Sequence, residues 1–395
     1  MRREGLSGEL WPAHVKPKSD EILSSWLVRL TMAHGLKLHT FCSIIWPGKQ
    51  IWTRDVDKST DSEIVQVLSY KTGTPFDRVR ATTLAAYEGV LYERHNHYGP
   101  TAWIMPVGVY HRTRRQFGLQ YCSRCLAEDK VSYYRRRWRL AFMVVCETHS
   151  IMLRDRCPQC QAAVNFHRDE LGNHKKIVAT SLTLCHSCGF DLREEKLTPA
   201  MKPITPAEVN FTKRLLGAMN SGYMKISESV ITYSHLYFTA LRQIMKVLAV
   251  QNDRVGKLRT AIIDAYGLDN YASSTKCISC DVQELSIELR RQLLGIARCL
   301  LDEWPLRFIE FSRKCGIWSS LWLRNLEPNA RERSRLAPFW FWSPVHDHLY
   351  RSKYQPSEEE TKAAIRYLNR KGEALNKSTL SRLLGVAVIR REITL

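Results

Sequence analysis

The sequence predicts a mainly α-helical protein whose middle part is built from small zinc-binding modules. Two observations predict this fold class. Apolar residues recur at helical spacing near both ends of the chain, and seven of the twelve cysteines lie between residues 122 and 188. A third observation concerns charge: 59 Lys and Arg against 39 Asp and Glu give a formal net charge of +20. Such an excess of cations is typical of proteins that bind a polyanion, and nucleic acid is the favoured candidate over a membrane surface.

Residues 1–110 are predicted to form an N-terminal helix-turn-helix-like domain. The expected helices cover residues 20–34, 38–45, 61–70 and 74–80. Ser19-Asp20 is expected to cap the first of them, and Gly35 to end it. We expect the polar lead-in before Asp20 to be free to order on a partner protein. A bundle of this kind either binds DNA or only supports its neighbours.

Residues 111–197 contain two sets of residues with metal-ligand spacing. Each set has two pairs, and two residues separate the members of a pair; four such donors match the tetrahedral shell of Zn²⁺. The first set is Cys122, Cys125, Cys146 and His149, and the second is Cys157, Cys160, Cys185 and Cys188. Because four protein ligands leave no position for water, we expect two structural zinc ions and no catalytic metal. A further pair, Cys277 and Cys280, has no matching pair.

Disulfide bonds are the alternative use of these cysteines, but they need an oxidising compartment. The first 30 residues contain no apolar segment with a cleavage site, and no stretch approaches the length of a membrane span. We therefore expect a cytoplasmic protein with reduced cysteines and no membrane partner.

His167, in the loop between the two pairs of the second set, is expected to be solvated.

Basic residues beside aromatic ones predict contacts with nucleic-acid phosphates. The alternative is that the aromatic side chains belong to the core and the arginines face water. The predicted nucleic-acid-binding residues are Arg112, Arg114, Arg115, Arg135, Arg136, Arg137, Arg139, Lys377, Arg382, Arg390 and Arg391.

Beyond a linker at residues 198–206, residues 207–355 are predicted to form a helical domain, with its clearest helix over 282–301. Residues 356–395 are predicted to form a C-terminal helix-turn-helix. Its expected helices cover residues 358–368, 377–384 and 387–395, the last of which would present Arg390 and Arg391 to DNA.

No enzyme motif accompanies these elements. The sequence has no P-loop, no HExxH, no deaminase signature and no nucleophile elbow. A nuclease whose carboxylates are far apart in sequence is not excluded by this search, although nothing in the sequence indicates one.

Four strings in the zinc region carry a family resemblance. They are Tyr121-Cys-Ser-Arg-Cys-Leu-Ala-Glu-Asp129, Tyr133-Tyr-Arg-Arg-Arg-Trp-Arg-Leu140, Cys146-Glu-Thr-His149 and Cys157-Pro-Gln-Cys160. Together with Glu21-Ile-Leu-Ser-Ser-Trp-Leu-Val-Arg-Leu30 they closely resemble the TniQ/TnsD family of bacterial transposition proteins. The resemblance covers about residues 15–190.

This resemblance implies an adaptor that selects the target site for transposition. Such a protein binds double-stranded DNA, or an RNA-guided effector bound there, and recruits an AAA+ ATPase that brings the transposase. The family's short members dock onto a CRISPR effector complex with its guide RNA, often as homodimers. The resemblance thus implies a bacterial, nucleoid-associated protein that is not an enzyme. A zinc-dependent transcription regulator and a zinc-stabilised nuclease are the alternatives.

Overall fold

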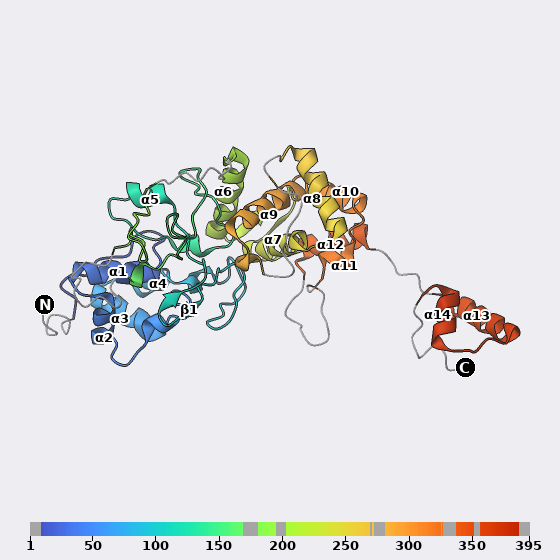
Figure 1. The fold of residues 1–395 in the computed structure, drawn as a ribbon, viewed down its shortest axis with the longest axis horizontal. Helices are drawn as coiled ribbons and strands as arrows, with labels where there is room; N and C mark the ends of the chain where they lie inside the picture. The colour runs from blue at the N-terminus through green and yellow to red at the C-terminus, as the bar shows by residue number, and fades with distance from the viewer. Residues whose placement is uncertain are drawn as a thin grey trace. The chain divides into compact units, whose positions relative to one another are not determined.

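The structure, a computed structural model, describes residues 9–168, 181–194, 203–268, 271, 281–324, 326, 337–350 and 356–386 (Figure 1). These residues are mainly helical, as predicted, and their regular strands form two short antiparallel hairpins. The chain divides into two compact units, residues 1–349 and residues 350–395. Among the described helices, none combines the length and the apolar character that a bilayer span requires.

Four helices open the first unit. They are α1 (Leu23–Ala33), α2 (Leu38–Ile45), α3 (Ser62–Thr72) and α4 (Phe76–Arg80). Asp61 caps α3 by accepting a hydrogen bond from the backbone N–H of Glu63, and Gly73 ends the helix at a φ of 59°. Gly35 follows α1 in the same left-handed conformation, with a φ of 62°. The helices predicted here are therefore present.

The predicted cap of α1 is wrong. The N-cap is Ile22, and the turn before it, in which Asp20 has a φ of 56°, pairs with a distant segment. The N–H of Ile22 donates to the carbonyl of Tyr134 at 3.0 Å, and the N–H of Arg136 donates to the carbonyl of Asp20 at 2.6 Å. The first N–H groups of α1 are satisfied by distant residues instead of a local cap: Leu23 donates to the carbonyl of Thr82 at 2.9 Å, and Ser24 donates to Asp57 Oδ1 at 2.7 Å.

The lead-in is also more ordered than expected. Trp11 is 1% exposed, and its N–H donates to the carbonyl of Lys71 at 2.9 Å. Trp26 of α1 is fully buried and donates its indole N–H to the carbonyl of Val15 at 2.8 Å. Trp11 and Val15 thus anchor the lead-in to the first unit.

The middle of the chain has little regular structure. Its elements are the hairpin of β1 (Val109–Tyr110) and β2 (Thr113–Arg114), the helix α5 (Ser123–Glu128), and short 3-10 turns that include η4 (Arg136–Arg139). Apolar residues hold this part together: Leu140–Val145 are all buried, as are Tyr134 and Trp138. Isolated bridges such as Ile104 with Leu140 replace a sheet.

The rest of the first unit is helical. Its elements are α6 (Pro206–Ser221), β3 (Tyr223–Lys225), β4 (Ile231–Tyr233), α7 (Ser234–Ala249), α8 (Asp253–Tyr266), η6 (Val282–Glu284), α9 (Ile287–Leu300), α10 (Leu306–Lys314), α11 (Ser319–Trp322) and α12 (Phe339–Leu349). Thr205 and Glu208 form a capping box at the start of α6, directly after the expected linker. The helix predicted over 282–301 begins later, since Ser286 caps α9.

One continuous core runs through the first unit. The indole N–H of Trp103 donates to the carbonyl of Phe238 in α7 at 3.1 Å. From α9, the buried guanidinium of Arg290 donates to the carbonyl of Ala141 at 2.6 Å and to Gln120 Oε1 at 3.0 Å. Burial lowers the pKa of Arg290 to about 10. The domain boundaries expected at 110 and 207 stay predictions.

The second unit is a helix pair, α13 (Glu358–Lys371) and α14 (Lys377–Leu384). Ser357 and Asn376 cap the two helices, and Gly372 and Gly385 follow them with left-handed φ angles of 65° and 72°. Its small core consists of Ala364, Ile365, Leu368 and Leu380. The helix expected over 387–395, with Arg390 and Arg391, lies outside the described residues.

Candidate metal centres and the arginines around them

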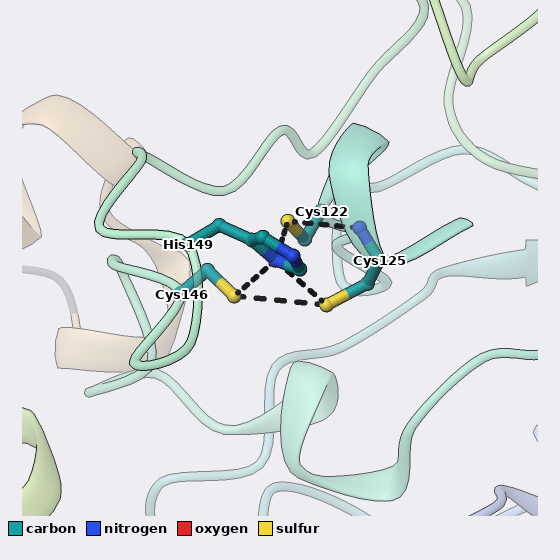
Figure 2. Close-up of side chains that lie close together, drawn as sticks. All are labelled: Cys122, Cys125, Cys146 and His149. Atoms are coloured by element: carbon teal, nitrogen blue, oxygen red, sulfur yellow. Dashed lines mark hydrogen bonds between the residues drawn. The ribbon is translucent and has the colours of Figure 1, made fainter. Parts of the chain in front are cut away.

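The first candidate metal centre joins the start of α5 to a turn at residues 146–151. Cys122 is the N-cap of α5 and Cys125 lies in its first turn, so the backbone N–H of Cys125 points at the sulfur of Cys122, at 3.4 Å. Cys146 and His149 approach from the other side, and the four side chains converge on one point (Figure 2). The three cysteines are buried.

The spacing of these donors fits a tetrahedral ion. Zn–S bonds of about 2.3 Å and Zn–N bonds of about 2.0 Å place tetrahedral sulfurs roughly 3.8 Å apart and a sulfur roughly 3.5 Å from the nitrogen. The sulfurs of Cys125 and Cys146 are 3.7 Å apart. The Nδ1 of His149 lies 3.3 to 3.5 Å from the three sulfurs. The residues therefore fit the metal that their spacing predicts.

His149 is oriented by a neighbouring carboxylate. Its Nε2 lies 2.7 Å from Oε2 of Glu128, the last residue of α5. With Nε2–H donating to this oxygen, Nδ1 is left unprotonated and faces the three sulfurs. A carboxylate behind a histidine ligand fixes the tautomer and the ring orientation, and raises the basicity of the ligand.

The second centre is built from one kind of turn used twice. The N–H of Gln161 donates to the carbonyl of Cys157 at 3.0 Å, and the N–H of Gly189 donates to the carbonyl of Cys185 at 2.8 Å. Both donors are left-handed, at φ 61° and 74°. Ser150, at φ 54°, closes the same turn on Cys146 in the first centre, at 2.9 Å. Three of the four ligand pairs thus share one local geometry.

The four sulfurs of the second centre also lie at ligand distances. Cys157 and Cys188 are 3.7 Å apart, and Cys160 and Cys185 are 3.6 Å apart. Cys157 and Cys185 are buried, whereas Cys160 and Cys188 lie at the surface. Each centre offers four protein donors, so both can hold a metal ion in a closed shell that leaves no position for a substrate. Cys277 and Cys280 lie outside the described residues.

The arginine run of η4 is used inside the protein. Arg139 is 0% exposed and donates to both oxygens of Asp55 at 3.1 and 2.6 Å and to Asp57 at 3.3 Å. Burial alone would raise the pKa of both carboxyls. The Arg139 charge nevertheless holds the pKa of Asp55 below its usual value, whereas burial and the Asp55 charge raise that of Asp57. A phosphate has no access to this guanidinium, so the predicted contact is wrong for Arg139.

The neighbouring arginines also have carboxylate partners. Arg135 forms a bidentate pair with Asp129 at 3.0 and 2.9 Å. Arg136 and Arg137 both lie 3.5 Å from Asp20, and Arg137 also lies 2.7 Å from Glu147. These ion pairs argue against the predicted phosphate contacts.

Arg114, in β2, shares the buried cluster of Arg139. It lies 3.5 Å from Asp57 and packs over the ring of Phe166 at 5.2 Å. Burial lowers its pKa, although the Asp57 charge opposes that shift. It therefore anchors the base of the hairpin from inside, and the predicted DNA contact is wrong for this residue too.

The tip of the same hairpin is different. His111 and Arg112 take left-handed φ angles of 45° and 62°, which make a type I′ turn without the usual glycine or asparagine. Arg112 and Arg115 are exposed, and neither forms an ion pair with another described residue. The guanidinium of Arg115 lies over the ring of Tyr110 at 3.8 Å. Of the contacts predicted between residues 112 and 139, Arg112 and Arg115 are therefore the ones that are exposed and have no ion pair among the described residues.

His167 contacts the backbone of the β1–β2 hairpin and is buried, whereas we expected it to be solvated. Its ring stacks on Trp52 at 4.7 Å, and its Nε2 lies 3.0 Å from the carbonyl of Arg112. Burial, with the nearby Arg114 charge, keeps its pKa well below the usual value. The ring is therefore neutral and structural. The local sequence around His167 does not predict its burial, because the ring on which it stacks, Trp52, is far away along the chain.

In the second unit, Lys377 is exposed in the first turn of α14. Arg382 is largely exposed and lies 3.7 Å from Glu373. Both remain accessible to a nucleic acid.

The family model of TniQ matches residues 12–153, a range that contains α1 to α5, the β1–β2 hairpin, the first metal centre and the arginine run. A comparison with curated proteins gave no match. The second metal centre lies just beyond the matched range.

Proposed function

We propose that the chain selects DNA target sites for transposition and recruits the machinery that inserts there, because the model of the TniQ family, whose proteins select transposition targets, matches residues 12–153. The TniQ match is the observation that carries this proposal. Proteins of this family are adaptors, and the described residues agree with that role. Both candidate metal centres offer a closed shell of four protein donors, and buried carboxylates such as Asp55 and Glu208 pair with arginines.

The two metal centres would hold Zn²⁺ as a structural ion. Three sulfurs and a nitrogen in one centre, and four sulfurs in the other, are the donor sets that structural zinc sites use. The metals would join segments without regular structure to α5 and to the core. Cys277 and Cys280 are not needed for either shell.

Contact with duplex DNA would come from cations that have no role inside the protein. The β1–β2 hairpin offers Arg112 at its tip and Arg115 directly after β2. The second unit offers Lys377 and Arg382, with Arg390 and Arg391 beyond the described residues. The net charge of +20 supports a polyanionic partner of this kind. Docking on an RNA-guided effector, as a monomer or a homodimer, would add to this contact and would not replace it.

Recruitment of the AAA+ ATPase would use the residues before Trp11. Because Trp11 is buried, a deletion that reaches it would damage the fold as well as remove the tail. Deletion of residues 2–9 should leave the melting temperature and the duplex affinity unchanged. The same deletion should abolish capture of the ATPase.

The proposal is tested by reconstituted insertion with purified ATPase and transposase, scored by the sites of insertion. Addition of the protein should concentrate insertions at selected sites, and its omission should leave them scattered or absent. Binding of DNA without any capture of the ATPase would favour a transcription regulator instead. Cleavage of DNA in Mg²⁺ that is lost when a carboxylate is replaced would favour a nuclease.

A further inference from the structure

Two adjoining hollows lie beside the β1–β2 hairpin, within the first unit. One has a volume of about 550 Å³ and the other of about 380 Å³. Both are lined by Met105, Pro106, Gln283 and Glu284, so they adjoin along the segments that lead into and out of the hairpin, and the pair is called the groove below. The groove contains no candidate metal ligand, and of the residues proposed to contact duplex DNA it includes Arg115.

Three arginines in and beside this groove lie over aromatic rings. The pairs are Arg54 over Tyr98 at 5.4 Å, Arg115 over Tyr110 at 3.8 Å, and Arg156 over Phe117 at 3.7 Å, measured from the guanidinium carbon to the ring centre. Tyr98 lines the larger hollow and is 68% exposed, whereas Tyr110 lies beside the groove, directly after Val109 of its lining, and is 51% exposed. The groove therefore presents large aromatic surfaces to solvent next to fixed positive charge.

The charge of the groove is not balanced locally. Asp55 is occupied by Arg139, and Asp155 by Arg156 at 2.7 and 3.1 Å. Arg54 and Arg115 form no ion pair with another described residue, and Lys58 adds a third cation. Glu284 is the exposed carboxylate on the shared wall. The groove thus suits an anionic ligand that also offers flat apolar faces.

From this combination we infer that the groove binds an unpaired nucleic-acid strand. Guanidinium groups contact the phosphates of such a strand, and its bases stack on tyrosine rings without regard to sequence. A duplex does not offer its base faces, because they are stacked inside the helix and only base edges reach the grooves. The inference rests on the proposed function, since a target duplex that is opened by an effector releases such a strand.

The test measures fluorescence anisotropy of the full-length, zinc-loaded protein with three probes. The probes are an oligo(dT) strand, an oligo(U) strand and a fully paired duplex of the same length. Replacing both rings, as Tyr98→Leu with Tyr110→Leu, should weaken strand binding about 100-fold, roughly tenfold for each ring. Binding of the duplex should change less than about twofold. A preference between the two strands would tell whether the natural ligand is DNA or RNA, and either preference supports the inference.

The chain supplies a matched control on the β3–β4 hairpin. Tyr223 and Tyr233 are exposed to a similar extent, with ring centres 5.1 Å apart, and lie outside the groove. Their double replacement by leucine should leave strand binding unchanged. A second variant, Arg54→Gln with Arg115→Gln, should lower the slope of log K against log salt for a strand by about 0.7 for each phosphate that is no longer neutralised.

Three outcomes would overturn the inference. The first is that the protein binds neither strand. The second is that the double replacements of Tyr98 with Tyr110 and of Tyr223 with Tyr233 weaken strand binding equally. The third is that replacement of Tyr98 and Tyr110 weakens duplex binding as much as strand binding. In the first case, intact duplex binding and targeted insertion would leave the proposed function standing. Loss of insertion with intact strand binding would instead count against the proposed function alone.

Discussion

The arginines of η4 and those of the β1–β2 hairpin look alike in sequence and are used in opposite ways. Both sets lie beside aromatic residues. In η4 and the residue before it, every guanidinium reaches a carboxylate inside the protein, and Arg139 reaches two. At the hairpin, Arg112 and Arg115 reach none among the described residues. The difference teaches that the acidic residues brought near an arginine by the fold decide its role, and the local sequence does not.

Removal of the metals is expected to have the largest effect on this comparison, because the metal centres would stabilise the part of the chain that contains both sets of arginines. Replacing one ligand, as Cys125→Ser, should unfold the middle of the chain, since structural zinc contributes on the order of 10 kcal/mol in small modules. Disappearance of the near-UV circular dichroism signal and of protein-bound zinc would report this.

Cys315→Ser is the matched control, because Cys315 is half-buried and lies in neither centre. Cys125→Ser protein that stays folded without bound zinc would show that the first centre does not stabilise the middle of the chain.

A smaller destabilisation is expected when the buried arginine is neutralised. Arg139→Gln would leave Asp55 and Asp57 buried with too little positive charge. Breaking a buried ion pair in this way costs about 3–5 kcal/mol. Urea unfolding should show this destabilisation, whereas Arg112→Gln should change the free energy of unfolding by less than about 0.5 kcal/mol. Equal stability of the two variants would remove the distinction between the two sets.

A finer test concerns the carboxylate behind His149. Glu128→Gln keeps the shape of the side chain but weakens the acceptor for the histidine N–H. Replacements of this kind reduce metal affinity about 10- to 100-fold. Competition with a chromogenic chelator should show one of two zinc ions released more readily. Glu147→Gln is the control, because Glu147 is next to the ligand Cys146 in the chain but its carboxylate pairs with Arg137. Equal release from both variants would show that Glu128 does not support the ligand.

The sequence predicted the parts of the structure that depend on local spacing. Asp61 and Gly73 bound α3 as expected, and the eight candidate metal ligands converge in two clusters. These features are encoded within a few residues, or by short repeated pairs.

The parts that were missed depend on contacts across the chain. Asp20 does not cap α1, because Arg136 and Arg137 engage it from more than a hundred residues away. Likewise, Asp57 lies between Arg114 and Arg139, and neither partner is near it in sequence. No periodicity or motif records such pairings, so the arginines of η4 could not be told from those of the hairpin beforehand.

The most direct test of this distinction is the salt dependence of duplex binding in two matched double variants. Arg112→Gln with Arg115→Gln should lower the slope of log K against log salt by about 1.8, because each phosphate that is no longer neutralised lowers it by about 0.9. Arg136→Gln with Arg137→Gln removes the same formal charge, and should leave the slope unchanged because Asp20 and Glu147 already occupy those guanidiniums. An unchanged slope in the hairpin variant, with a lowered slope in the η4 variant, would contradict the account.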